Sequence, residues 1–143
     1  MSDESNSSVM NEQYARRALE ALNRAALAIA SELDVDKVLQ LIVDSARELV
    51  GAKYAALAVG DWGMPGPGNV HRFVVSGLSR EQIRGIDHWP HGRGLLGAVI
   101  HGQKPIRLRQ MKDDARSVGS PEGHPSMESF LGVPILGAGE TMG

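Results

Sequence analysis

Residues 33–59, LDVDKVLQLIVDSARELVGAKYAALAV, carry the strongest structural signal in the chain. Their first half repeats apolar residues at the spacing of one helix face, namely Val38, Leu39, Ile42, Val43, Ala46, Leu49 and Val50. Asp34 is the expected N-cap, because its carboxylate can accept a backbone N–H of the first turn. Gly51 is expected just after the last turn, where a left-handed residue commonly ends a helix. The apolar run 53–59 then predicts a buried strand.

A second helix is predicted upstream of this segment, from Glu12 onward. One helix face is formed by apolar residues at helical spacing, namely Ala18, Leu22, Ala25, Ile29 and Leu33. A second group widens this face, namely Leu19, Ala26 and Ala30. This face fits either a core-packing helix or a signalling helix through which two copies dimerise, and the spacing favours neither. Residues 1–11 are polar and predict a disordered tail, which leaves residues 12–143 as the domain.

The rest of the chain alternates strands, helices and turns. A Gly- and Pro-rich loop separates strand 53–59 from a strand at 70–76, so the two predict a hairpin. Ser79 and Gln82 form a capping-box pattern for a helix that continues to about His88. A helix at 94–101, a strand at 105–108, an irregular segment at 109–128 and a strand at 130–136 follow. The order predicts an α+β fold, an antiparallel sheet flanked by helices. It is expected to be truncated in mid-hairpin, because the partner strand that would begin at Thr141 stops at Gly143.

Composition narrows the class of protein. The chain has 143 residues, 42% of them apolar and 22% charged, and a net charge of −2. No basic cluster stands out, which argues against a nucleic-acid partner. The apolar runs are too short to cross a membrane and the N-terminus lacks a signal peptide, so a cytoplasmic protein is expected. The absence of cysteine excludes disulfides, thiol catalysis and cysteine zinc sites.

Two motifs look chemical but have structural explanations. Residues 92–97, GRGLLG, match G-x-G-x-x-G, but turn residues precede them instead of the strand that a dinucleotide-binding unit requires. A glycine-rich helix start packed closely on the sheet is the better interpretation. A metal site could be suggested by three histidines, His88, His91 and His101. His88 and His91 would lie on one face of a helix, but Pro90 between them breaks such a helix, so a surface loop is the better interpretation. No serine lies in a nucleophile elbow, so we expect no enzymatic activity.

Several of these segments together resemble GAF domains, which are small-molecule sensor modules. The likeness rests on the stretch LDVDKVLQLIVDSARELVGAKYAALAV, on GRGLLGAVIHGQKPIRL at 92–108 and on FLGVPI at 130–135. It implies the antiparallel sheet flanked by helices described above, and a sensory function.

A closer resemblance is to the first GAF domain of mycobacterial dormancy-type oxygen and redox sensor histidine kinases, which binds haem b. It rests on residues 104–108, 115–127 and 130–135. In that family a histidine before Pro-Pro-Met is the proximal iron ligand, and His124 matches it, although Ser126 replaces the second proline. The likeness implies a two-component sensor of O2, NO or CO. The family's distal tyrosine would lie beyond the end of this chain.

A haem also needs an apolar slot, and the sequence offers seven candidates to line it: Leu95, Leu96, Val99, Ile100, Met127, Phe130 and Leu131. The alternative for each of them is ordinary core packing. The alternative for the whole chain is a GAF domain that binds another small ligand, or a dimerisation scaffold without haem.

Overall fold

The computed structural model describes residues 2–31, 34–62, 69–86, 91–120 and 122–143. It divides into two compact units, each described here by itself. Unit 1 comprises Met1–Ala56 and Val74–Gly77, and unit 2 comprises Leu57–Phe73 and Leu78–Gly143. Among the described residues no helix is long and apolar enough to cross a membrane.

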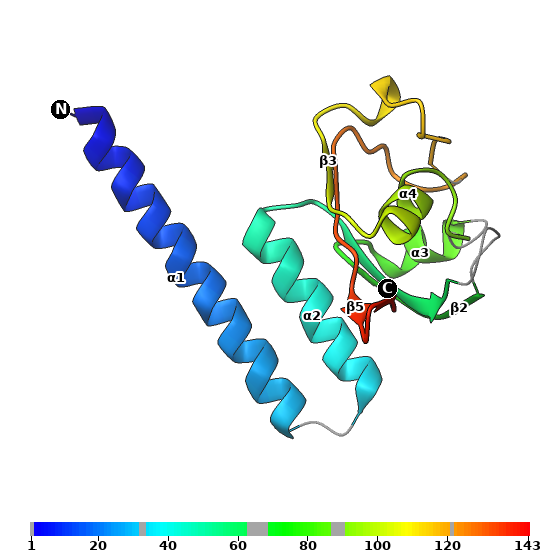
Figure 1. The fold of residues 1–143 in the computed structure, drawn as a ribbon, viewed down its shortest axis with the longest axis horizontal. Helices are drawn as coiled ribbons and strands as arrows, with labels where there is room; N and C mark the ends of the chain where they lie inside the picture. Colours follow the sequence, from blue (N-terminus) through cyan, green and yellow to red (C-terminus); the bar gives the residue numbers. More distant parts are fainter. Residues whose placement is uncertain (1, 32–33, 63–68, 87–90, 121) are drawn as a thin grey trace. The chain divides into compact units, whose positions relative to one another are not determined.

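Unit 1 is built on two helices, α1 (Ser2–Ser31) and α2 (Val35–Val50), which lie side by side (Figure 1). The predicted ends of α2 are confirmed. Asp34 accepts a hydrogen bond from the backbone N–H of Asp36 at 3.0 Å, and Gly51 has φ 64°. Gly51 can hold this left-handed conformation because it has no side chain. Val43 is the most buried apolar residue of α2, with 2% of its surface exposed.

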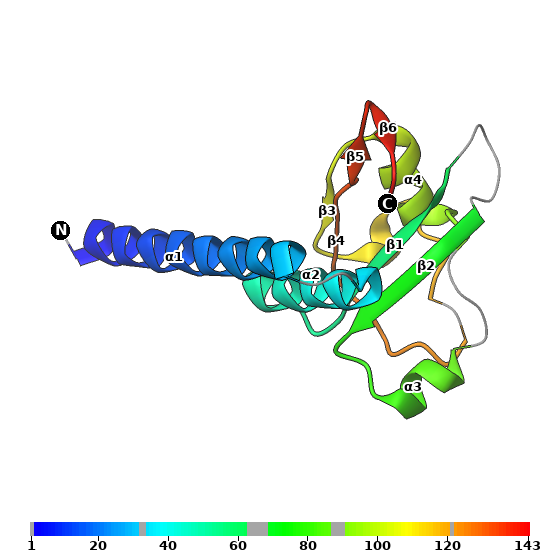
Figure 2. The same ribbon diagram turned by 90° about the horizontal axis from the view of Figure 1, so that it is seen from below.

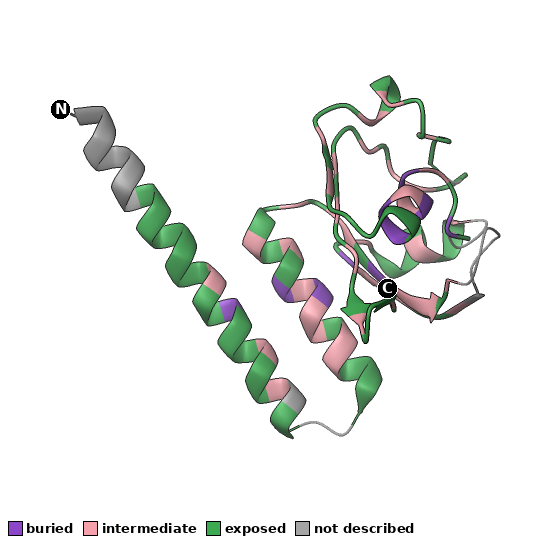
Figure 3. Ribbon diagram, viewed as in Figure 1, coloured by how far each residue is buried: buried purple, intermediate pink, exposed green. Residues whose placement is uncertain are grey.

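The face of α1 that packs on α2 differs from the predicted one. Ala21 is buried, and Ala18, Ala25 and Ala28 are half-buried, whereas the side chain of Leu22 is 68% exposed (Figure 3). Small side chains let two helix axes approach closely, so the alanine face is the one turned inward. Leu33 of the predicted stripe lies outside the described residues.

Helix α1 begins at Ser2, whereas the helical period of the sequence begins at Glu12. The disordered tail at 1–11 and the domain bounds 12–143 stay predictions. Residues 14–30 are rich in alanine, and a helix with such high propensity extends at low cost once it has formed.

Unit 2 contains most of the remaining elements. β1 (Ala55–Asp61) pairs with β2 (Asn69–Ser76), and both strands begin or end in unit 1 (Figure 2). The other elements are α3 (Arg80–Gly85), α4 (Gly94–Gly102), β3 (Ile106–Leu108), the 3-10 turn η1 (Met111–Asp113), β4 (Phe130–Gly132), β5 (Leu136–Gly137) and β6 (Glu140–Thr141). β3 pairs antiparallel with β4, and β5 with β6. The mixture of helices and antiparallel strands confirms the predicted α+β class.

Three local predictions in unit 2 can be compared directly. The Ser79–Gln82 capping box is present in full. The helix that it begins ends at Gly85, and His88, the predicted end, lies outside the described residues. The predicted strand 130–136 is divided into β4 and β5, because Pro134 between them has no N–H to donate to a ladder. Ile135 resumes the pairing, since its N–H donates to Gly143 at 2.7 Å.

Candidate functional site

The loop from Asp114 to Ser129 carries His124 and is held at several points. At its start the Arg116 guanidinium donates two hydrogen bonds to the Asp114 carboxylate, at 2.7 and 2.8 Å. These bonds, with one from the Arg116 backbone, lower the pKa of Asp114 to about 2. At its end the Met111 N–H donates to the Glu128 carbonyl at 2.6 Å. The first pair of bonds is local to the loop, whereas the Met111–Glu128 bond and a bond from the Asp114 N–H to the Met111 carbonyl join the two ends of the loop to the η1 turn.

The residue before His124 is also closely packed. Gly123 has φ 79°, and a Cβ there would collide with the carbonyl of Gly85 at the end of α3. The only side chain that this approach permits is a hydrogen atom, so the loop passes against α3 at one defined point. This contact sets the position from which the His124 side chain extends.

The His124 imidazole is half-buried and its tautomer follows from its partner. Nδ1 lies 2.7 Å from the carbonyl oxygen of Pro125. A carbonyl only accepts, so Nδ1 must carry the proton in this bond. Nε2 of the neutral ring is then the basic nitrogen, the one that can bind a metal or accept a hydrogen bond.

The seven predicted slot residues fall into three groups. Leu95, Val99 and Ile100 of α4 are buried in the core of unit 2. Leu96, Met127 and Phe130 are half-buried. Leu131 is 52% exposed, because the alternation along β4 directs it away from the face that carries Phe130.

Packing between α4 and β4 is direct. A Cβ at Gly132 would lie 2.8 Å from Val99 Cγ2 and 2.7 Å from Phe130 Cζ. These side chains therefore fill the space over Gly132. Val99 serves as core there, and a contact of Leu95, Val99 or Ile100 with a cofactor stays a prediction.

The glycines of the GRGLLG segment have structural reasons to be present. Gly92 and Gly94 have φ 69° and 63°, a region that other residues rarely adopt. Gly97 packs against the Gly92 carbonyl, and a Cβ at Gly94 would lie 2.7 Å from Val118 Cγ2. The glycine spacing is thus explained by close packing around the start of α4, as the sequence analysis interpreted it.

The histidines of the described ranges other than His124 lie in no metal-binding cluster. Among the described residues no group of three or more His, Cys, Asp or Glu is arranged to hold an ion. His91 and His101 are exposed. His88 lies outside the described residues, so its part in the motif has no structural description.

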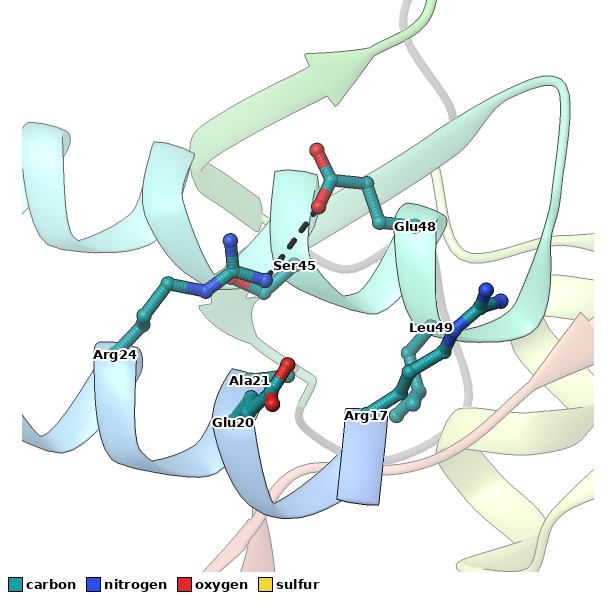
Figure 4. A pocket seen from close by; sticks show the side chains of 7 residues that line it. All are labelled: Arg17, Glu20, Ala21, Arg24, Ser45, Glu48 and Leu49. Carbon is teal, nitrogen blue, oxygen red and sulfur yellow. Dashed lines mark hydrogen bonds and ion pairs between the residues drawn. The ribbon is translucent and has the colours of Figure 1, made fainter. Parts of the chain in front are cut away.

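Unit 1 has a small cavity that the sequence analysis did not anticipate. It lies between α1 and α2, has a volume of about 270 Å³ and is lined by Arg17, Glu20, Ala21, Arg24, Ser45, Glu48 and Leu49 (Figure 4). Arg24 Nη2 lies 3.5 Å from Glu48 Oε2 across it. The sequence does show opposite charges on the two predicted helices. Neither helix pattern alone could show that Arg24 of α1 faces Glu48 of α2.

Trp62 is a second feature that the sequence analysis did not single out. Its indole Nε1 is buried and has no hydrogen-bond partner among the residues described. A buried N–H without an acceptor is costly, so it is a donor that a bound molecule or water could satisfy.

Comparisons with known proteins agree with this architecture. A sequence model of the GAF domain matches residues 32–143. The structure is similar to the GAF domain of a phosphoenolpyruvate-protein phosphotransferase from Coxiella burnetii, with a TM-score of 0.70 and 22% identity over 90% of this chain and 74% of that one. It is also similar to the GAF domain of the Acinetobacter phosphoenolpyruvate-protein phosphotransferase, with a TM-score of 0.63 and 19% identity over 87% and 71% of the two chains.

The chain therefore belongs to the GAF domain family, a family of sensory and regulatory domains. Because the two solved domains share only 22% and 19% sequence identity with this chain, the structural similarity establishes its fold and nothing more. The family match covers α2 and all later elements, and α1 lies entirely before it.

Proposed function

We propose that this chain is the sensory GAF domain of a cytoplasmic two-component protein and that it binds haem b through His124. The observation that carries the proposal is the 2.7 Å contact between His124 Nδ1 and the Pro125 carbonyl oxygen, which can only accept and so orients Nδ1 as the donor. An axial histidine ligand needs its other nitrogen protonated and oriented in this way. The two-component part rests on the sequence resemblance of residues 104–108, 115–127 and 130–135.

The residues around His124 fit an axial ligand in two respects. The loop is held by the Met111–Glu128 hydrogen bond and by the close approach of Gly123 to Gly85, so little reorganisation is needed to hold the ring. Leu96, Met127 and Phe130 are half-buried and retain apolar surface that a porphyrin can cover. When bound, the haem iron would supply the coordination of O2, NO or CO. The protein's own part is to hold the imidazole and exclude water.

Hemin titration of the purified protein tests the proposal. We expect a Soret shift that saturates at one haem per chain and is lost in His124→Ala. His101→Ala is the matched control, because His101 is an exposed histidine of the same unit, and it should bind like the wild type.

A shift that persists in His124→Ala would show that haem binds elsewhere. The absence of any shift in a folded wild-type protein would favour the alternative, a GAF domain that senses a different small molecule. Circular dichroism of each variant separates loss of the ligand from loss of the fold.

A further inference from the structure

The ladder formed by β3 and β4 has two faces of different character (Figure 2). Exposed and half-buried residues alternate along both segments, from position 105 to 109 and from position 130 to 135. Among the half-buried positions, Gly132 lies against Val99 of α4. Because successive side chains of a strand point to opposite faces, the exposed positions share the face turned away from α4. This outer face comprises Pro105, Arg107, Arg109, Leu131, Val133 and Ile135.

Unpaired positive charge is concentrated on and beside the outer face. Four of the chain's 15 basic residues lie between positions 104 and 112, with no acidic residue among them: Lys104, Arg107, Arg109 and Lys112. All four are exposed, and within the described ranges none of them has a hydrogen bond or an ion pair from its side chain. Arg116, shortly after them, is by contrast paired with Asp114. Like charges held close together repel one another, so an anionic partner would lower the electrostatic energy of this segment.

A row of exposed apolar side chains lies beside these charges. Leu131 is 52% exposed, Val133 59% and Ile135 42%. The register of the ladder places Leu131 directly opposite Arg107. Arginine is enriched in protein interfaces, and adjoining exposed apolar residues mark surfaces that bind another molecule. The combination is therefore typical of a face that a protein segment covers.

The spacing of the two rows matches an amphipathic helix. Leu131 and Val133 are two residues apart on an extended chain, which separates them by about 6.7 Å. Positions i and i+4 of a helix are about 6.0 Å apart along its axis, so two apolar residues at that spacing can each meet one of these side chains. Arg107 and Arg109 repeat the same spacing on the neighbouring strand, about 4.8 Å to the side. Carboxylates beside the apolar stripe of such a helix would reach them.

From these observations we infer that the outer face binds an acidic amphipathic helix of a partner protein. The apolar stripe of that helix packs on Leu131 and Val133, and its carboxylates pair with Arg107 and Arg109. The inference does not depend on haem binding, because His124 takes no part in it and the outer face is turned away from α4.

A protein helix fits this surface better than a large polyanion does. The whole chain has a net charge of −2, which opposes long-range attraction to nucleic acid or to an anionic membrane. A single helix contacts only the outer face, so the local positive charge decides its binding. Nucleic acid is held through its phosphates by Lys and Arg, and the apolar row would contribute nothing to those contacts.

A synthetic helix tests the inference on the full chain. The probe is a fluorescein-labelled peptide of about 18 residues built from Leu, Ala and Glu, with Leu at i, i+4 spacing and Glu on both sides of that stripe. Fluorescence anisotropy should show saturable binding with a Kd of roughly tens of micromolar, weaker at higher salt. The control peptide has the same composition in a scrambled order that places no two Leu on one face, and it should bind at least about 10-fold more weakly.

Two variants of the chain separate the charged row from overall charge. Arg107→Glu combined with Arg109→Glu should weaken peptide binding by at least about 10-fold, because like charges would then face each other. Arg80→Glu combined with Arg84→Glu is the matched control: it changes the net charge equally at two exposed positions of α3, and it should bind like the wild type.

The apolar row has its own pair of variants. Val133→Ser should weaken binding several-fold, because it removes apolar surface that the helix would cover. Val118→Ser is the control, since Val118 is 76% exposed but lies beside Gly94 at the start of α4, and it should not change binding. Circular dichroism of each variant confirms that the fold is retained.

Four results would overturn the inference. The first is no binding of the peptide to folded wild-type protein at about 1 mM. The second is equal affinity for the ordered and scrambled peptides, and the third is equal loss of binding in the two arginine double variants. The fourth is tighter binding of a DNA duplex of about 20 base pairs or of phosphatidylserine vesicles than of the peptide, lost in the Arg107→Glu, Arg109→Glu protein, which would assign the outer face to a polyanion.

Discussion

Gly97→Ala tests whether close packing, rather than ligand binding, explains the glycines at the start of α4. A Cβ at Gly97 would collide with the carbonyl oxygen of Gly92 and lie 3.0 Å from its carbonyl carbon. The obstacle is backbone, and Gly92 is itself buried with φ 69°. The added methyl group cannot be accommodated by a side-chain rotation.

The expected magnitude combines two opposing effects. Overpacking of a core position typically costs about 1–3 kcal/mol. Replacing glycine by alanine inside a helix returns about 1 kcal/mol. Because backbone must move, we expect a net loss of about 1–2 kcal/mol in the free energy of unfolding. For a chain of this size that corresponds to a decrease in Tm of about 2–8 °C.

Thermal and urea unfolding followed by far-ultraviolet circular dichroism measure the effect. The matched control is Gly102→Ala, at the end of the same helix, where nothing lies within 4 Å of an added Cβ. This control should be neutral or up to about 1 kcal/mol more stable than the wild type. A Gly97→Ala protein as stable as the control would refute the packing argument and reopen a functional explanation of the motif.

Three further variants have defined expectations. Val43→Ala, at a position 2% exposed, should cost about 2 kcal/mol in urea unfolding, and a loss below about 0.5 kcal/mol would show that Val43 is not core. At Gly51 an added Cβ would meet open space, but the residue has φ 64°. Gly51→Ala should therefore lower the free energy of unfolding by about 1 kcal/mol, and Gly51→Asn should lower it less, because asparagine tolerates this conformation better. Equal losses in the two variants would contradict the conformational explanation. The lowered pKa of Asp114 means that its ion pair stabilises the fold fully above pH 3.8 and loses this effect as the pH falls toward 2. Asp114→Asn should therefore remove this part of the acid dependence in thermal melts between pH 5 and 2. An unchanged dependence of Tm on pH would contradict a stabilising role of the ion pair.

Local signals determined the ends of several elements. Asp34, Gly51 and Ser79 act through hydrogen bonds or backbone conformations within a few residues of themselves, so their neighbours in the sequence are enough to predict them. The α+β class followed from the order of these elements. His124 lies in an irregular segment, as predicted for residues 109–128, whereas the half-burial of its ring is seen only in the structure.

Other features depended on partners that are distant in the chain. Both apolar stripes of α1 have helical spacing, and only the position of α2 decides that the alanines turn inward and Leu22 outward. The cavity between Arg24 and Glu48 likewise requires two helices to be placed together. The interruption of strand 130–136 has a local cause, Pro134, but only the tertiary structure shows that β4 pairs with β3 and that Ile135 pairs with Gly143.

The candidate site shows the same division. The sequence by itself determined that His124 stands beside a proline in a glycine-rich loop, in a chain whose lack of cysteine restricts its chemistry. Only the tertiary structure decided that Gly123 rests against Gly85 and that Val99 fills the space over Gly132. The physical reason is the sequence distance between interacting groups. Helix caps and turns form between residues that are close in sequence, whereas burial and close packing require contacts between residues that are far apart in the chain.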